Sequence, residues 1–125
     1  MTIEADFSGW VTIRSLSGQI AESAPTTLSA FVDIAQQPMP RVEVRVRSGS
    51  LANTPAAVTL AVWRKSGGAV DKLGTIVIAS TDIATPIPQL FESYDSSIYV
   101  TVESFSGGTS PTMTATIEAR GVFGA

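Results

Sequence analysis

Apolar and polar side chains alternate with a period of two along most of this chain, and no other feature constrains its fold as strongly. The plainest case is the segment RVEVRVR, residues 41–47, in which valines and charged residues take strict turns. Successive side chains of a strand point to opposite faces of a sheet, so this spacing predicts strands with one buried face. No segment has the 3.6-residue period of an amphipathic helix.

Glycine, proline, serine and threonine fall mostly between these segments and mark turns. The segments predicted as strands are 2–7, 10–16, 27–34, 41–47, 56–64, 73–79, 98–105 and 112–123. LGTIVIA, residues 73–79, is apolar on both faces, which predicts a central strand. Residues 48–55 are predicted to form a loop. We expect an ordered crossover loop over residues 80–97, with one helical turn in QLFESY, residues 89–94.

Short strands with turn signals between them, and no crossover helices, predict an all-β fold. We expect a single antiparallel β-sandwich, jelly-roll-like, of about eight strands, with one domain over residues 1–125. Hydrophobic residues make up 44% of the 125, so the domain can bury a core without the support of disulfides, and it has no cysteine.

The formal net charge of −3 argues against general nucleic-acid binding, which normally needs a basic surface. No apolar run is long enough to cross a membrane. The N-terminal segment MTIEADFSGW has acidic residues where a signal peptide has basic ones. We therefore expect a chain made in a cytoplasm that binds neither nucleic acid nor membranes.

The chain also has no histidine, so the commonest general base and the usual ligands of transition metals are missing. Lys65 and Lys72 surround a glycine turn that leads into a strand, whereas a phosphate-binding loop leads into a helix. The carboxylates Asp82, Glu92 and Asp95 have no spacing that selects a catalytic pair or a calcium loop. We predict no enzyme activity, no catalytic residue, no metal site and no cofactor.

The charged face of residues 41–47 has two interpretations. One-sided burial alone produces this spacing, and neighbouring strands can supply carboxylates such as Glu103 or Glu118 to its arginines. The alternative is a contact patch for an acidic partner surface, formed by Arg41, Arg45 and Arg47.

Two aromatic residues at the ends of the chain are candidates for apolar anchors on a partner, Trp10 and Phe123. The predicted last strand carries threonines on its polar face, and low charge suits a face that contacts another protein. A different class of function, carbohydrate binding, would use aromatic residues opposite the apolar faces of their strands, namely Trp63 and Tyr99.

Three segments together resemble small β-sandwich virion proteins of tailed bacteriophages: WRKSGG, IVIASTDI and SSIYVTVESFSGGTSPTMTATIEARG. The resemblance covers mainly residues 57–121. It implies a virion-located cement or decoration protein that binds the major capsid protein or another virion protein. Such a protein would form a symmetric homo-oligomer, such as a trimer. A tail or baseplate component and a carbohydrate-binding receptor-recognition module remain alternatives.

Overall fold

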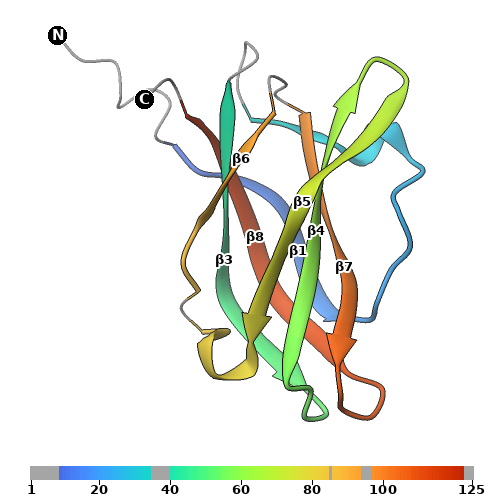
Figure 1. Ribbon diagram of the computed structural model, residues 1–125, viewed down its shortest axis with the longest axis vertical. Coiled ribbons are helices and arrows are strands. Elements are labelled where there is room, and N and C mark those ends of the chain that lie inside the picture. The colour runs from blue at the N-terminus through green and yellow to red at the C-terminus, as the bar shows by residue number, and fades with distance from the viewer. Residues whose placement is uncertain (1–8, 35–39, 85, 94–96, 123–125) are drawn as a thin grey trace, which may run out of the picture.

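The computed structural model describes residues 9–34, 40–84, 86–93 and 97–122, which form two four-stranded antiparallel sheets (Figure 1). Sheet A contains β1 (Val11–Gln19), β3 (Arg41–Ala52), β6 (Gln89–Glu92) and β8 (Thr112–Val122). Sheet B contains β2 (Val32–Asp33), β4 (Ala57–Ser66), β5 (Ala69–Ala79) and β7 (Ser97–Ser106). Two short 3-10 turns are η1 (Leu28–Ala30) and η2 (Ser80–Asp82). The predicted strand at residues 2–7 lies outside the described residues.

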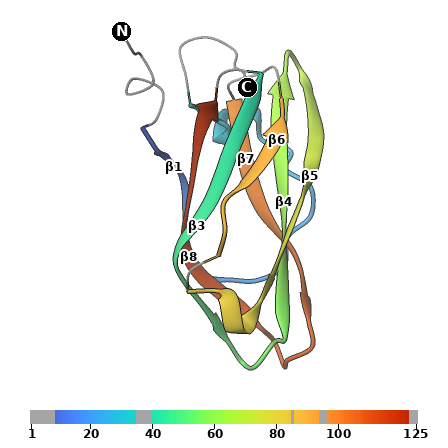
Figure 2. The ribbon, with the colours of Figure 1, turned by 60° about the vertical axis from the view of Figure 1, so that its left-hand side comes forward.

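The strand order is β1-β8-β3-β6 in sheet A and β2-β7-β4-β5 in sheet B. Every connection crosses from one sheet to the other except the hairpin between β4 and β5. This is the order of a jelly roll, and it confirms the predicted fold class. Figure 2 shows the two layers, with β1, β3 and β8 on one side and β4, β5 and β7 on the other.

The core lies between the sheets and is built from the inward side chains of the alternating strands. Fully buried members include Val42, Val44, Val58, Leu60, Val62, Ile98, Val102, Met113 and Ile117. The predicted alternation is therefore confirmed for β3, β4, β7 and β8. None of the described residues belongs to a helix that is long and apolar enough to span a membrane.

Residues 27–34 do not form the predicted strand. They contain η1 and then the two-residue β2, which pairs with the start of β7. The buried residues here are Phe31 and Ile34, three positions apart, and this spacing follows a turn better than a strand.

The predicted helical turn in QLFESY is also wrong. Residues 89–92 form β6, which pairs with the beginning of β3 and places Phe91 opposite Val42. A 3-10 turn lies earlier in the segment, at η2. In place of the predicted loop at residues 48–55, β3 continues to Ala52 through a register shift at Ser48, whose φ is 53°.

The segment predicted as a central strand is the outermost strand of sheet B. β5 pairs with β4 along one side. It is apolar on both faces, but the outward Val77 is 68% exposed. The apolar outward face of this strand therefore does not come from a central position in the sheet.

Candidate functional site

β3, which contains the alternating segment of residues 41–47, is buried on one face and exposed on the other, as the interpretation by one-sided burial predicts. Its three valines point into the core and are at most 6% exposed, while Arg45 and Glu43 lie on the outer face of sheet A. The pairing of β3 with β8 adds two more charged residues to this outer face: Glu118 lies opposite Arg45, and Arg120 lies opposite Glu43.

These cross-strand pairs form an arginine–glutamate ladder made of Glu43, Arg45, Arg47, Glu118 and Arg120. The Nε atom of Arg45 donates to Glu118 at 2.7 Å, and Nη1 of Arg47 donates to its other oxygen at 3.3 Å. The Nε atom of Arg120 donates to Glu43 at 2.8 Å. Glu118 is buried, with 7% of its surface exposed, so its two arginine donors replace the water it has lost.

Trp10 covers the middle of the ladder. It directly precedes β1, and the pairing of Val11 with Ala119 places it beside Arg120. The guanidinium carbon of Arg45 is 4.0 Å from the centre of the indole ring, and that of Arg120 is 4.5 Å away. Both distances are typical of cation–π contacts, so the ring fixes the two arginines that the glutamates already hold.

The structure thus brings together three of the five predicted contact residues, Trp10, Arg45 and Arg47. Arg41 lies at the beginning of β3, opposite Glu92 and Val122. Phe123 lies outside the described residues. The register places four arginines and three glutamates on this face, so its excess positive charge is small.

Of the two carboxylates suggested as partners for the arginines, Glu118 takes this role and Glu103 does not. Glu103 lies on sheet B, where it pairs with Lys72. Lys65 is half-buried near the end of β4. Within the described ranges, no group of three acidic side chains is close enough to hold a metal ion.

The two aromatic candidates for sugar binding are direct cross-strand neighbours on the outer face of sheet B. Trp63 of β4 lies opposite Tyr99 of β7. The indole Nε1 donates to Oγ1 of Thr101 at 2.9 Å, and the Lys72 ammonium is 5.9 Å from the ring centre. The Tyr99 ring contacts the guanidinium of Arg14 at 4.9 Å. Both rings are therefore already in contact with other side chains.

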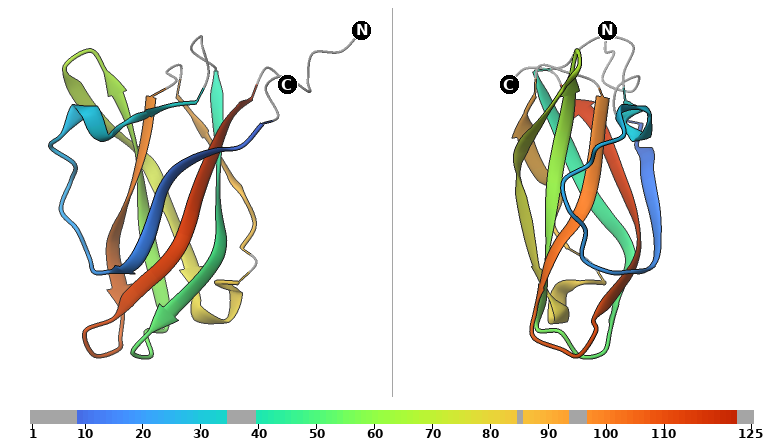
Figure 3. Two further views of the ribbon diagram at one scale, coloured as in Figure 1. Left: turned by 180° about the vertical axis from the view of Figure 1, so that it is seen from behind. Right: turned by 90° about the vertical axis from the view of Figure 1, so that its right-hand side faces the viewer.

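A second ion pair, which the sequence does not indicate, covers the edge of β7. Residues 20–27 form a strap that leaves β1 and runs along this edge (Figure 3, right). The backbone N–H of Glu22 donates to the Val102 carbonyl at 2.7 Å, and its carboxylate accepts from the Val102 N–H at 2.9 Å. Arg14 binds the same carboxylate at 2.9 Å and donates to the Val100 carbonyl at 3.0 Å.

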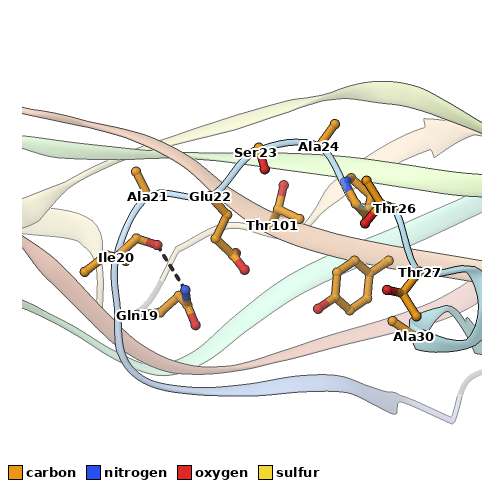
Figure 4. A pocket seen from close by; sticks show the side chains of 12 residues that line it. Gln19, Ile20, Ala21, Glu22, Ser23, Ala24, Thr26, Thr27, Ala30 and Thr101 are labelled. Carbon is orange, nitrogen blue, oxygen red and sulfur yellow. Dashed lines mark hydrogen bonds between the residues drawn. The ribbon is translucent and has the colours of Figure 1, made fainter.

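Between the strap and β7 lies an open groove of about 590 Å³. Figure 4 shows the side chains of Glu22 and Thr101 pointing into this space, with Gln19 at one end. The lining is mostly small and polar, and Tyr99 contributes an aromatic surface. Of the two predicted sugar-binding residues, Tyr99 lines this groove, whereas Trp63 is not among the lining residues and reaches it only through its hydrogen bond to Thr101.

Comparisons of the chain with protein-family models, with curated proteins and with solved structures found no match. The function therefore has to be argued from the geometry of the two sheet faces.

Proposed function

We propose that this protein is a structural component of a tailed-bacteriophage virion, a cement or decoration protein that stabilises the capsid by binding the major capsid protein. The observation that carries the proposal is the outer face of sheet A, where Trp10 and the arginines of the ladder are held in place by neighbouring side chains. Tryptophan and arginine are the residue types most enriched among those that dominate binding energy at protein interfaces.

Their fixed positions support a binding role because ordering a long side chain on binding costs about 0.5–1.5 kcal/mol. Ion pairs to Glu43 and Glu118 restrict the arginines in advance, so less entropy is lost when a partner covers them. A protein that binds only the assembled shell then favours the shell over its separate subunits by mass action. Viral capsid proteins and lectins both use the jelly-roll architecture, which agrees with the proposal but does not assign a function.

The first experiment is mass spectrometry of purified phage particles produced from the genome that encodes the chain. We expect the protein in intact particles and in isolated heads, at a fixed ratio to the major capsid protein. Its presence in isolated tails alone would favour the tail or baseplate alternative, and its absence from particles would refute a virion role.

The second experiment measures binding to particles that lack the protein. Arg47 is the suitable ladder residue, because 56% of its side chain is exposed and its contact with Glu118 is longer, at 3.3 Å, than the 2.7 Å contact of Arg45. We expect Arg47→Gln to weaken binding several-fold. The matched control is Lys72→Gln, which removes the same charge from the opposite sheet and should bind as the wild type does. Equal weakening by both variants would exclude the ladder as the contact surface.

Carbohydrate binding is the second candidate, favoured by the Trp63–Tyr99 pair, of which Tyr99 lines the polar groove. A glycan array tests it: binding that is lost in Trp63→Ala and kept in Trp63→Phe would support this function. Failure of the wild type to bind any glycan on the array would count against it.

A further inference from the structure

Among the strands that the structure describes, each sheet of the sandwich ends in strands whose outer edges have no neighbouring strand. Sheet A ends in β1 and β6. Sheet B ends in β5 on one side, and on the other side in the short β2 and, beyond it, in β7. An exposed strand edge carries unpaired N–H and C=O groups that can pair with another chain, and natural proteins usually protect such edges.

Three of these edges are protected. β1 has two register shifts, and Gly18 within it has a φ of 60°. β6 has four residues and follows Pro86 and Pro88. β2 has two residues, and the strap covers the β7 edge beyond it through Glu22. Bulges, short strands, prolines and covering segments are the usual means of preventing edge-to-edge pairing.

β5 differs from the other edges. It has eleven residues, and its part from Leu73 to Ala79 contains no charged residue and no proline. The register shift between β4 and β5 lies at the beginning of this part, where Leu73 has no partner on β4, and the pairing from Gly74 to Ala79 is regular. In the part of the chain that the structure describes, only β4 pairs with β5, so one side of β5 is left without a neighbouring strand (Figure 2, right-hand margin).

Exposed apolar side chains gather beside this edge. Val77 of β5 is 68% exposed, and Ile87, in the segment that leads to β6, is 79% exposed. Both line a hollow of about 310 Å³ together with Ile76, Ile78 and Pro86, and with the polar residues Asp82 and Gln89. Large exposed apolar side chains beside an open edge are typical of a site where another protein binds.

We propose that a second copy of the chain pairs with β5 in antiparallel orientation about a two-fold axis, so that the two B sheets join into one continuous sheet. Such strand addition provides main-chain hydrogen bonds, and the exposed apolar side chains provide the burial. The pairing would remove Val77 and Ile87 of both copies from water.

The distribution of charge identifies the occupant as a second copy. In a two-fold interface each surface meets its own copy, so a patch of one charge sign would repel itself. The segment Leu73–Ala79 carries no charge, so two copies of it do not repel each other, wherever the two-fold axis falls within the segment. Lys72 and Asp82 flank the segment at opposite ends, and antiparallel pairing turns the Lys72 end of one copy toward the Asp82 end of the other.

Sedimentation equilibrium of the purified protein over a wide concentration range tests the proposal. We expect twice the mass of one chain for the wild type and the mass of one chain for Val77→Lys, with an unchanged circular-dichroism spectrum that shows the variant to be folded. Thr75→Lys, also at an exposed position of β5, should act in the same way. The control Ser15→Lys puts the same charge on an exposed position of the protected β1 edge and should stay dimeric. A monomeric or trimeric wild type, or a dimeric Val77→Lys, would overturn the proposal.

Because the chain has no cysteine, single cysteines can locate the interface. A short bifunctional thiol cross-linker should join two chains of Val77→Cys efficiently, while Ser15→Cys should remain uncross-linked. Equal cross-linking of the two variants would place the contact elsewhere. Both experiments use protein without particles, so their failure would leave the proposed virion role untouched, and a negative particle experiment would leave the pairing untouched.

Discussion

Arg45 and Glu118 face each other across β3 and β8, and their side chains form an ion pair of 2.7 Å in which the glutamate side chain is only 9% exposed. The second carboxylate oxygen accepts from Arg47. A carboxylate at this depth is stable because both of its oxygens have cationic donors, so the ladder contributes to stability as well as to the proposed contact surface.

Replacement of Glu118 by glutamine should therefore lower the free energy of unfolding by about 1–3 kcal/mol. The substitution removes the buried negative charge that the guanidinium groups of Arg45 and Arg47 share. Urea denaturation measures the change. Glu103→Gln is the control, because Glu103 pairs with Lys72 at the surface, where such pairs contribute about 0–1 kcal/mol. Equal effects of the two substitutions would show that the burial of Glu118 is not important.

Trp10 should stabilise the ladder through its two ring contacts, each worth about 0.5–1 kcal/mol at a partly exposed site. We expect Trp10→Ala to lose about 1–2 kcal/mol and Trp10→Phe to lose less, because phenylalanine keeps a weaker ring face. A double-mutant cycle with Arg120→Ala isolates the contact with Arg120. A coupling energy of zero would show that the contact between Trp10 and Arg120 does not contribute to stability.

The strap should open when Glu22 is removed. Glu22→Ala deletes the acceptor of the Val102 N–H and the partner of Arg14, and we expect faster amide exchange at Val102 and faster cleavage of residues 20–27 by proteinase K. Glu22→Gln keeps an oxygen that can accept the hydrogen bond and should show a smaller effect. Exchange at Ile117 in sheet A serves as the internal control. Unchanged exchange at Val102 in Glu22→Ala would contradict the assigned role.

The loop between β7 and β8 should tolerate no side chain at Gly108. Its φ is 83°, and an added Cβ would lie 2.7 Å from the backbone oxygen of Asn53. We expect Gly108→Ala to cost about 1–3 kcal/mol from the strained conformation and this contact. Gly68→Ala is the matched control, since nothing lies within 4 Å of its added Cβ. Thermal denaturation of the two variants should separate them clearly.

The sequence predicts the fold best where a strand has one buried and one solvent-exposed face. β3, β4, β7 and β8 are of this kind, and their valines and isoleucines alternate with polar residues. The two-residue period does not predict the position of β5 in its sheet, because an apolar outward face is expected both for a covered central strand and for an edge strand that binds another chain. It also fails at residues 27–34, where burial with a three-residue spacing marks a turn.

The candidate site is predictable to a similar extent. The Arg45–Glu118 pair follows from the chemistry of neighbouring strands. Alternation alone cannot tell which sheet a carboxylate joins, so the sequence offers Glu103 equally as a partner for the arginines. The contacts of Arg14 and Glu22 with β7 connect segments about 80 positions apart and have no local pattern. Trp10 could be named as an anchor, but its position on the arginines depends on the pairing of β1 with β8.

The strand order also constrains when the domain can form during synthesis. β8 lies between β1 and β3, and Val11 pairs with Ala119 near the other end of the chain. A ribosome must therefore release most of the polypeptide before sheet A can close, and until then the edges of β1 and β3 that pair with β8 have no partner. Such non-local pairing slows folding, and we expect the nascent chain to depend on chaperones until its last strand emerges.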